Sequence, residues 1–231
     1  MITEVRDNIR FHLGDCMELM VGKLENYWDL AVVDPPYGIG QPKQSNLKGY
    51  KGRASLEDRL TKNRLNTGCG KLKNRNLNRT NCDWDNDVPI QEYFNELRKR
   101  SKNQIIWGGN YFPLPPTRCV ICWDKVQPWE NFSQIEIAWT SFDSPAKLFK
   151  YDNRTGGKIH PTQKPIKLYR WILQNYAKEG QTILDTHGGS MTNAIACDME
   201  GYSLDICEID EEYFEDGLKA FDNYKRQLKL F

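Results

Sequence analysis

The sequence lacks any apolar run long enough to cross a membrane, since no stretch of about 20 apolar residues occurs among its 231 residues. Its first residues include charged Glu4, Arg6 and Asp7 and no apolar core of a signal peptide. The seven cysteines are odd in number and scattered, unlike the even framework of a disulfide-rich secreted protein. These absences predict a cytoplasmic protein with reduced thiols and no membrane contact.

The sequence is not short of core-forming residues. Hydrophobic residues make up 39% and charged residues 27%, which excludes global disorder. A chain of this length buries roughly 70% of its unfolded surface, enough for a core without disulfides. No internal repeat is present. We therefore expect one domain over 1–231.

Charge is balanced overall but unevenly distributed. The net charge is +1, yet between 41 and 81 eleven lysines and arginines face only Glu57 and Asp58. This stretch carries +9 and the rest of the chain −8. Such a block indicates either a polyanion partner or a solvated loop. We expect 38–87 to form an inserted basic loop or small lobe.

Short apolar and β-branched runs alternate with helical periodicities along the chain. Strands are expected at 9–13, 28–33, 104–107, 119–123, 134–139, 182–185 and 202–208, and helices over 16–24, from Pro89, after Pro165, over 192–200 and over 211–226. This alternation predicts an α/β fold with a doubly wound, mostly parallel, Rossmann-like sheet. Ligands of such sheets bind beyond the carboxyl ends of the strands.

The motif Asp34-Pro35-Pro36-Tyr37 ends the strand 28–33. Two prolines cannot continue a strand ladder, so the chain must leave the sheet there. The Asp34 carboxylate and the Pro35 carbonyl can each accept a hydrogen from an exocyclic amino group. The Tyr37 ring can stack on a nucleic-acid base. The motif is therefore a candidate base-holding site, with a proline-rich turn as the alternative.

A second motif is the glycine loop His187–Ser190, which follows the strand 182–185 and precedes a helix. Such a loop lets a ligand approach the backbone closely. The next strand ends at Glu208, where a carboxylate can accept ribose hydroxyls. The Gly-x-Gly-x-x-Gly fingerprint of nicotinamide cofactors is absent. A plain glycine turn with a surface acid remains the alternative.

The chain contains three motifs in a fixed order: Asp-Pro-Pro-Tyr at 34–37, His-Pro-Thr-Gln-Lys-Pro at 160–165 and Asp-Thr-His-Gly-Gly-Ser at 185–190. In this order they resemble the motifs of the β-type amino-group DNA methyltransferases. The resemblance runs from Phe11 to about Phe221 and is weakest across 41–81. It implies a methyltransferase sheet, S-adenosylmethionine as cofactor, and methylation of the exocyclic N6 of adenine flipped from duplex DNA. A cytosine N4 methyltransferase, an RNA amino-methyltransferase and a DNA-binding relic remain open.

The resemblance assigns roles residue by residue. The base-holding, catalytic residues are Asp34, Pro35, Pro36 and Tyr37. The cofactor-binding residues are Asp15, Asp34, His160, Thr162, Lys164, Asp185, His187, Gly189, Ser190 and Glu208. Within this set Asp15 would lie near the adenine and Glu208 would bind the ribose. Asp185 and the glycine loop would bind the methionine part, and the residues of 160–164 would close over its end.

Two departures from the family pattern lie in the glycine loop. The family usually has phenylalanine where His187 stands and glycine where Met191 stands. A methionine is expected to crowd the approach of helix and strand that glycine permits.

The chemistry of the motifs favours direct transfer to an amino group. When Asp34 and Pro35 accept the amine hydrogens, the nitrogen lone pair turns toward the methyl group, and in-line displacement depends mainly on positioning. Methylation of cytosine C5 would instead need a cysteine nucleophile. The family presents it as Pro-Cys, which is absent. Adenine is favoured over cytosine because the motif begins with Asp34 rather than serine.

Partners and metals follow from the remaining features. Double-stranded DNA is the expected partner, with 110–158 as a target-recognition region, and a homodimer is expected by resemblance. The tail Gln227-Leu228-Lys229-Leu230-Phe231 resembles the peptide with which bacterial replication proteins hold the sliding clamp, although its apolar residues can instead fold back. The spacing of Cys119 and Cys122 fits a zinc site, which Cys69 or Cys82 could complete. However, Cys119 and Cys122 lie in a predicted strand and would point to opposite faces of the sheet. No metal is therefore predicted. A bacterial or phage-encoded, nucleoid-associated protein is expected.

Overall fold

The computed structural model describes residues 1–38, 88–127, 133–152 and 163–228. The basic stretch 41–81, and with it most of the predicted insert, lies outside the described residues, as do His160 and Thr162. In the described part of the chain, no helix is long and apolar enough to cross a membrane.

One sheet forms the centre of the fold, with the strand order β1-β2-β9-β8-β3-β4-β6-β5-β7. Its strands are β1 Ile2–Arg6, β2 Ile9–Leu13, β3 Trp28–Val33, β4 Ser101–Trp107, β5 Val120–Asp124, β6 Ile135–Thr140, β7 Lys147–Lys150, β8 Thr182–Asp185 and β9 Ser203–Glu208. The five central strands β2, β9, β8, β3 and β4 are parallel to one another. Strands β1 and β6 pair antiparallel with their neighbours, so the predicted, mostly parallel sheet is confirmed.

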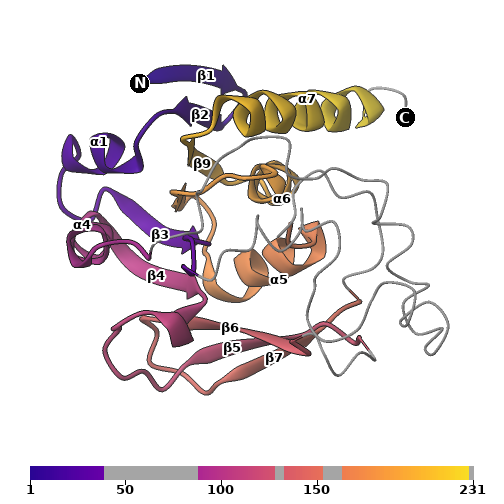
Figure 1. The fold of residues 1–231 in the computed structure, drawn as a ribbon. Helices are drawn as coiled ribbons and strands as arrows, with labels where there is room; N and C mark the ends of the chain where they lie inside the picture. The colour runs from indigo at the N-terminus through magenta and orange to yellow at the C-terminus, as the bar shows by residue number, and fades with distance from the viewer. Residues whose placement is uncertain (39–87, 128–132, 153–162, 229–231) are drawn as a thin grey trace, which may run out of the picture.

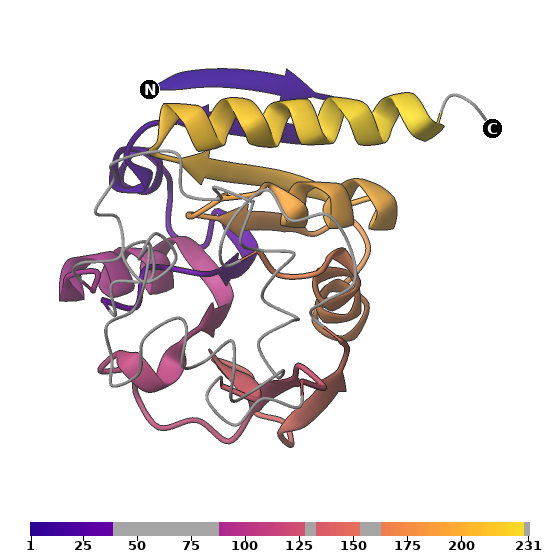
Figure 2. The same ribbon diagram turned by 45° about the vertical axis from the view of Figure 1, so that its right-hand side comes forward.

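Helices cover both faces of the sheet (Figures 1 and 2). They are α1 Cys16–Val21, α4 Gln91–Arg100, α5 Ile166–Tyr176, α6 Thr192–Glu200 and α7 Glu211–Leu228, with a short 3-10 helix, η2, over Gly109–Tyr111. Alternate residues of β3 divide between the two cores: Leu30 and Val32 pack with α5, α6 and α7, whereas Ala31 and Val33 pack with α1 and α4. The doubly wound arrangement is therefore confirmed.

The predicted elements differ from the observed ones mainly at the edges of the sheet. Strands β1 and β7 were not predicted because each has one neighbour and exposes apolar residues, among them Ile2 and Leu148. Helix α4 begins at Gln91, so Ile90 is its exposed N-cap residue and not part of the buried stripe. Helix α7 runs to Leu228, two residues beyond the predicted end.

The strand order changes direction between β8 and β3. From β8 the chain passes through α6 to β9 on one side, and from β3 it passes through α4 to β4 on the other. Adjacent parallel strands at such a point leave a crevice at their carboxyl ends, where ligands bind. Because β3 and β8 are paired in parallel, Asp34 and Asp185 lie at the same edge of the sheet.

Candidate active site

Asp34 follows β3 directly and is held by two donors. The Tyr37 hydroxyl donates to Asp34 Oδ1 at 2.6 Å, and Lys164 Nζ donates to Asp34 Oδ2. The Tyr37 ring stacks on Tyr111 of η2, with ring centroids 5.0 Å apart and planes 14° apart. Gly108, at φ 70°, permits this arrangement, because a Cβ there would overlap the Tyr37 ring. The side chains of Asp34 and Tyr37, both predicted for the site, are thus close together and hydrogen-bonded to each other.

Lys164 lies between two carboxylates and is only 3% exposed. Besides Asp34, its Nζ contacts Glu136 Oε2 at 3.3 Å, and Lys125 pairs with the other oxygen of Glu136. Burial alone would lower the pKa of Lys164, but Asp34 and Glu136 raise it above its ordinary value. Burial raises the pKa of Asp34, and the lysine opposes that rise. A cationic Lys164 therefore favours the ionised form of the Asp34 carboxylate.

Asp185, at the end of β8, is a buried carboxylate with two donors. Its Oδ2 accepts from Asn193 Nδ2 at 3.0 Å and its Oδ1 accepts from the His187 backbone N–H at 3.1 Å. Burial raises the pKa of Asp185 to about 7. A carboxylate with this burial and pKa favours a cationic ligand, because a positive charge beside it would stabilise the ionised form.

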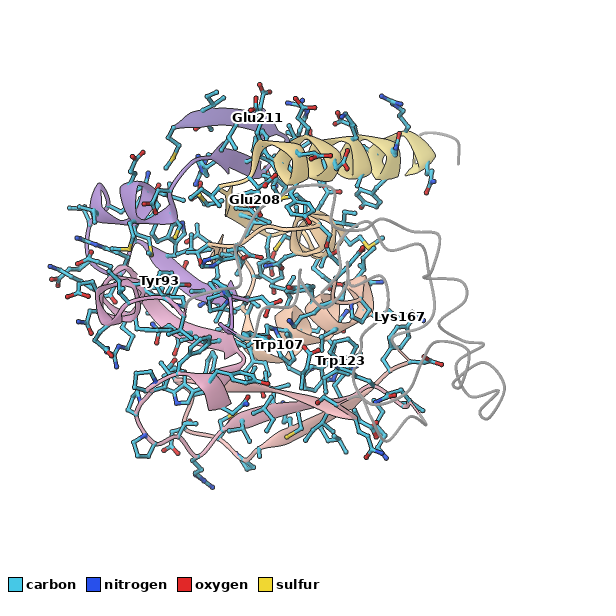
Figure 3. The ribbon with its side chains drawn as sticks, viewed as in Figure 1. Tyr93, Trp107, Trp123, Lys167, Glu208 and Glu211 are labelled. Carbon is cyan, nitrogen blue, oxygen red and sulfur yellow. The ribbon has the colours of Figure 1, made fainter. Side chains whose placement is uncertain are left out.

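Glu208, at the end of β9, ties the glycine loop to the neighbouring strand. The Gly189 N–H donates to Glu208 Oε2 at 2.7 Å, and the N–H groups of Ile209 and Asp210 donate to Oε1 at 3.0 and 2.9 Å. A carboxylate has about four acceptor positions, so about one remains for a ribose hydroxyl. Figure 3 shows Glu208 and Trp107 at the ends of β9 and β4, with the ends of β8 and β3 between them in the strand order.

His187 takes the place of the phenylalanine that the family usually has. Its Nδ1 lies 2.9 Å from Thr186 Oγ1, which lies 2.7 Å from the Tyr93 hydroxyl. The rings of His187 and Tyr93 meet edge to face, 5.5 Å between centroids. Burial lowers the pKa of His187 to about 4. The histidine is therefore a neutral aromatic ring at pH 7, much as phenylalanine would be.

Met191 adopts a left-handed conformation at φ 52° at the start of α6, and its side chain is fully buried. It packs against Gly188 of the loop and Gly217 of α7, and a Cβ on either glycine would overlap it. Gly217 thus provides the space that the methionine requires. The crowding that the sequence predicts around Met191 is avoided because Gly217, on a different helix, has no side chain.

Three other residues of the predicted cofactor set lie in the described part of the chain: Asp15, Ser190 and Lys164. Asp15 is exposed and caps α1, its Oδ1 accepting from the Met17 N–H at 2.8 Å. The preceding Gly14 donates its N–H to the Glu208 carbonyl, so Asp15 lies near Glu208. Ser190 Oγ is 2.7 Å from Thr192 Oγ1. Lys164, expected to close over the methionine end of the cofactor, contacts Asp34 and Glu136.

Two residues of the site were not found from the sequence. Glu136 lies in the alternating run Ile135-Glu136-Ile137, which predicts an outward polar side chain on a strand. Tyr111 follows two glycines in a loop, and nothing local indicates that its ring meets Tyr37. Both reach the site only through the pairing of β6 with β4 and the turn of η2.

The cysteines do not gather into a metal site in the part of the chain that the structure describes. No group of three histidine, cysteine or acidic side chains is close enough there to hold an ion. Cys119 is buried before β5 and Cys122 lies within that strand. Cys69 and Cys82 are outside the described residues.

The chain combines a doubly wound sheet, a glycine loop, a carboxylate at the end of the next strand and Asp-Pro-Pro-Tyr at the switch point. These features, with the family match below, place it in the class of S-adenosylmethionine-dependent methyltransferases. The chain belongs to the DNA methylase family of N6-adenine and N4-cytosine methyltransferases, whose family model matches residues 71–219. The family and cofactor that the motifs predicted are confirmed.

One curated relative and several solved structures are similar to this chain. The DNA adenine methyltransferase YhdJ of Escherichia coli K12 is 26% identical over 98 residues, which are 42% of this chain and 32% of that protein. The chain therefore spans about a third of this curated relative. The M1.HpyAVI complex with S-adenosylmethionine has a TM-score of 0.56 at 17% identity, over 92% of this chain and 99% of that one.

Two further solved structures share the fold. The cytosine-N4-specific PvuII DNA methyltransferase has a TM-score of 0.58 at 13% identity, over 93% and 86% of the two chains. A putative DNA modification methylase from Thermus thermophilus has a TM-score of 0.52 at 16% identity, over 91% and 93%. At these identities, the likeness concerns the fold alone.

Proposed function

We propose that this protein transfers a methyl group from S-adenosylmethionine to the exocyclic N6 of an adenine flipped out of duplex DNA. The observation that carries the proposal is the pair of carboxylates at the switch point. Asp34, with the Tyr37 ring, is on the base side, and Asp185, with the glycine loop, is on the cofactor side.

The cofactor side fits a cationic nucleoside. Asp185 favours the α-ammonium of the methionine part, and Glu208 keeps about one acceptor position for a ribose hydroxyl. The neutral ring of His187 adds an apolar surface beside the loop. When bound, the cofactor supplies a methyl group activated by a sulfonium charge. The protein's own task is to hold that group in line with the amine.

On the base side, Asp34 accepts a hydrogen of the target amine. Both of its oxygens already accept one hydrogen bond, from Tyr37 and Lys164, and each retains a second acceptor position. The ammonium of Lys164 favours the ionised form of Asp34, which can take up the proton that the methylated nitrogen must lose. Asp34 is then the acceptor in contact with that nitrogen, and the proton leaves through it.

Adenine is the proposed base because the motif begins with aspartate and because the E. coli relative is named an adenine methyltransferase. Cytosine N4 is the second candidate, since an N4-specific enzyme shares the fold. The test is to incubate the protein and S-adenosylmethionine with duplex DNA, single-stranded DNA and RNA, and to identify methylated nucleosides by mass spectrometry. N6-methyladenine in the duplex supports the proposal. N4-methylcytosine, methylated RNA alone, or no product would each contradict it.

Two regions are proposed to contact the DNA. The segment 38–87, with its +9 stretch, would bind the phosphate backbone, and 110–158 would read the target sequence. Support for the second comes from Tyr111 and Lys125, which lie at the base side of the site. Neutralising three basic residues of 41–81 should reduce the salt slope of DNA binding by about 3. An unchanged slope would assign phosphate binding to another surface.

Two further partners are proposed. A homodimer, expected from the family, is tested by light scattering, and a monomer at all concentrations would contradict it. For the sliding clamp, Gln227 is exposed at the end of α7, whereas Leu230 and Phe231 lie outside the described residues. Deleting 227–231 should abolish binding to a bacterial clamp in a fluorescence titration. Equal binding by both chains would contradict the proposal.

A further inference from the structure

Tyr169 is a deeply placed tyrosine on α5 with an unused hydroxyl. The residue is 7% exposed and packs in the core cluster that includes Val32, Trp107 and Met191. In the core on the other face of the sheet, the buried tyrosine is Tyr93, and its hydroxyl pairs with Thr186. For Tyr169 no hydrogen bond occurs within the part of the chain that the structure describes.

The Tyr169 oxygen is also not fully enclosed. Among the described residues, the only fully enclosed side-chain nitrogen or oxygen without a partner is Trp107 Nε1. The Tyr169 oxygen has no partner among the described residues and is not fully enclosed. A buried hydroxyl without a hydrogen bond is unfavourable in the free protein, and a ligand that supplies the missing contact removes that cost.

Tyr169 lies in the first turn of α5, near the carboxylates of both half-sites. Burial raises the pKa of Tyr169 well above its ordinary value, and the negative charges of Asp185 and Asp34 add to that rise. Asp185 belongs to the cofactor side and Asp34 to the base side. Helix α5, which carries Tyr169, begins just after Lys164 and packs against α6, whose Asn193 bonds Asp185. The hydroxyl therefore lies at the junction of the two half-sites.

We propose that the Tyr169 hydroxyl oxygen binds the transferable methyl group of the cofactor through C–H···O contacts. The inference rests on the proposed function. A sulfonium draws electron density from its methyl group, so the methyl hydrogens become attractive to an oxygen acceptor. The methyl group is also the part of the cofactor that must lie between Asp185 and Asp34. The contact would point it toward the amine.

The test compares Tyr169→Phe with Tyr224→Phe. Tyr224 is a tyrosine of α7 whose hydroxyl donates to Asp198 at 2.9 Å, away from the site. Binding of S-adenosylmethionine and of S-adenosylhomocysteine, which lacks the methyl group and its charge, is measured by calorimetry. The Tm of each free protein is measured in parallel.

Tyr169→Phe should weaken S-adenosylmethionine binding about five-fold, as expected for one or two such contacts, and change S-adenosylhomocysteine binding less than about two-fold. Because the hydroxyl is unpartnered in the free protein, the Tm should stay the same or rise. Tyr224→Phe should lower the Tm and leave both affinities unchanged.

Three results would overturn the inference: an equal loss for both ligands, no loss for either, or a lowered Tm of free Tyr169→Phe. An equal loss of affinity for both ligands would mean that the Tyr169 hydroxyl contacts the methionine or nucleoside part of the cofactor. Failure of the wild-type chain to bind S-adenosylmethionine would remove both proposals. Binding with the expected Tyr169 effect, but without DNA methylation, would remove only the proposed function.

Discussion

The contact between Met191 and Gly217 gives a prediction that the structure makes quantitative. Gly217 lies inside α7, and a methyl group there would overlap Met191 Cγ and crowd its Cβ. Replacing glycine with alanine inside a helix stabilises the folded state by about 1 kcal/mol through helix propensity. Overpacking costs about 1–3 kcal/mol. Gly217→Ala should therefore lower the free energy of unfolding by up to about 2 kcal/mol, despite the better helix former.

The same substitution should have the opposite effect when Met191 is shortened. Met191→Ala removes a fully buried side chain and should cost about 2–5 kcal/mol. In that background, the new methyl group at 217 enters the space left by the methionine. Gly217→Ala should then stabilise by about 1–2 kcal/mol, from helix propensity and the buried methyl group.

Urea denaturation of the wild type, both single variants and the double variant measures the coupling between the two positions. A coupling energy of about 1–4 kcal/mol, with the sign reversal described, is expected. Additivity within about 0.5 kcal/mol would refute the reasoning, because it would mean that the two side chains do not share the space.

The cofactor side yields two further predictions. Burial raises the pKa of Asp185 to about 7, and a cationic ligand prefers the ionised form of this carboxylate. The affinity for S-adenosylmethionine should therefore be constant above pH 8. Below pH 7 it should fall with a slope that approaches ten-fold per pH unit. Calorimetry from pH 5.5 to 8.5 measures this affinity for the wild type and for Asp185→Asn. An affinity of the wild type that does not change with pH, and that Asp185→Asn does not alter, would contradict the prediction. His187→Phe should keep cofactor affinity within about three-fold, because burial already holds the ring neutral, with a pKa of about 4, whereas His187→Ala should lose about ten-fold. Equal losses in both variants would show that the imidazole nitrogens, and not the ring, matter.

The sequence predicts those parts of the site that sit at strand ends. Asp34, Asp185 and Glu208 each follow an apolar strand, and parallel strands bring their carboxyl ends to one edge of the sheet. Local patterns are enough for these residues, since strand and turn are both encoded within a few positions.

The rest of the site depends on contacts between distant segments. Glu136 looks like the outward residue of an alternating strand, and Tyr169 like part of the apolar stripe of a helix. Only the pairing of β6 with β4 brings Glu136 to Lys164. Only the packing of α5 against α6 brings Tyr169 near enough to Asp185 and Asp34 for their charges to raise its pKa. Likewise, Met191 is accommodated by Gly217, a glycine far along the chain that no local pattern relates to it.

The most direct test of the central claim is single-turnover methylation of duplex DNA by Asp34→Asn, compared with the wild type and with Glu215→Gln. Glu215 is an exposed carboxylate of α7 paired with Lys219 on the surface, so its variant controls for loss of charge alone. Asparagine keeps the shape of Asp34 but loses the charge that accepts the amine hydrogen and pairs with Lys164. The wild type and Glu215→Gln should form N6-methyladenine at equal rates, and Asp34→Asn should be about 100-fold slower or more, roughly the effect of losing one charged acceptor at the reacting atom. A rate for Asp34→Asn within a few-fold of the wild type would contradict the assignment of Asp34 as the group that positions the target amine.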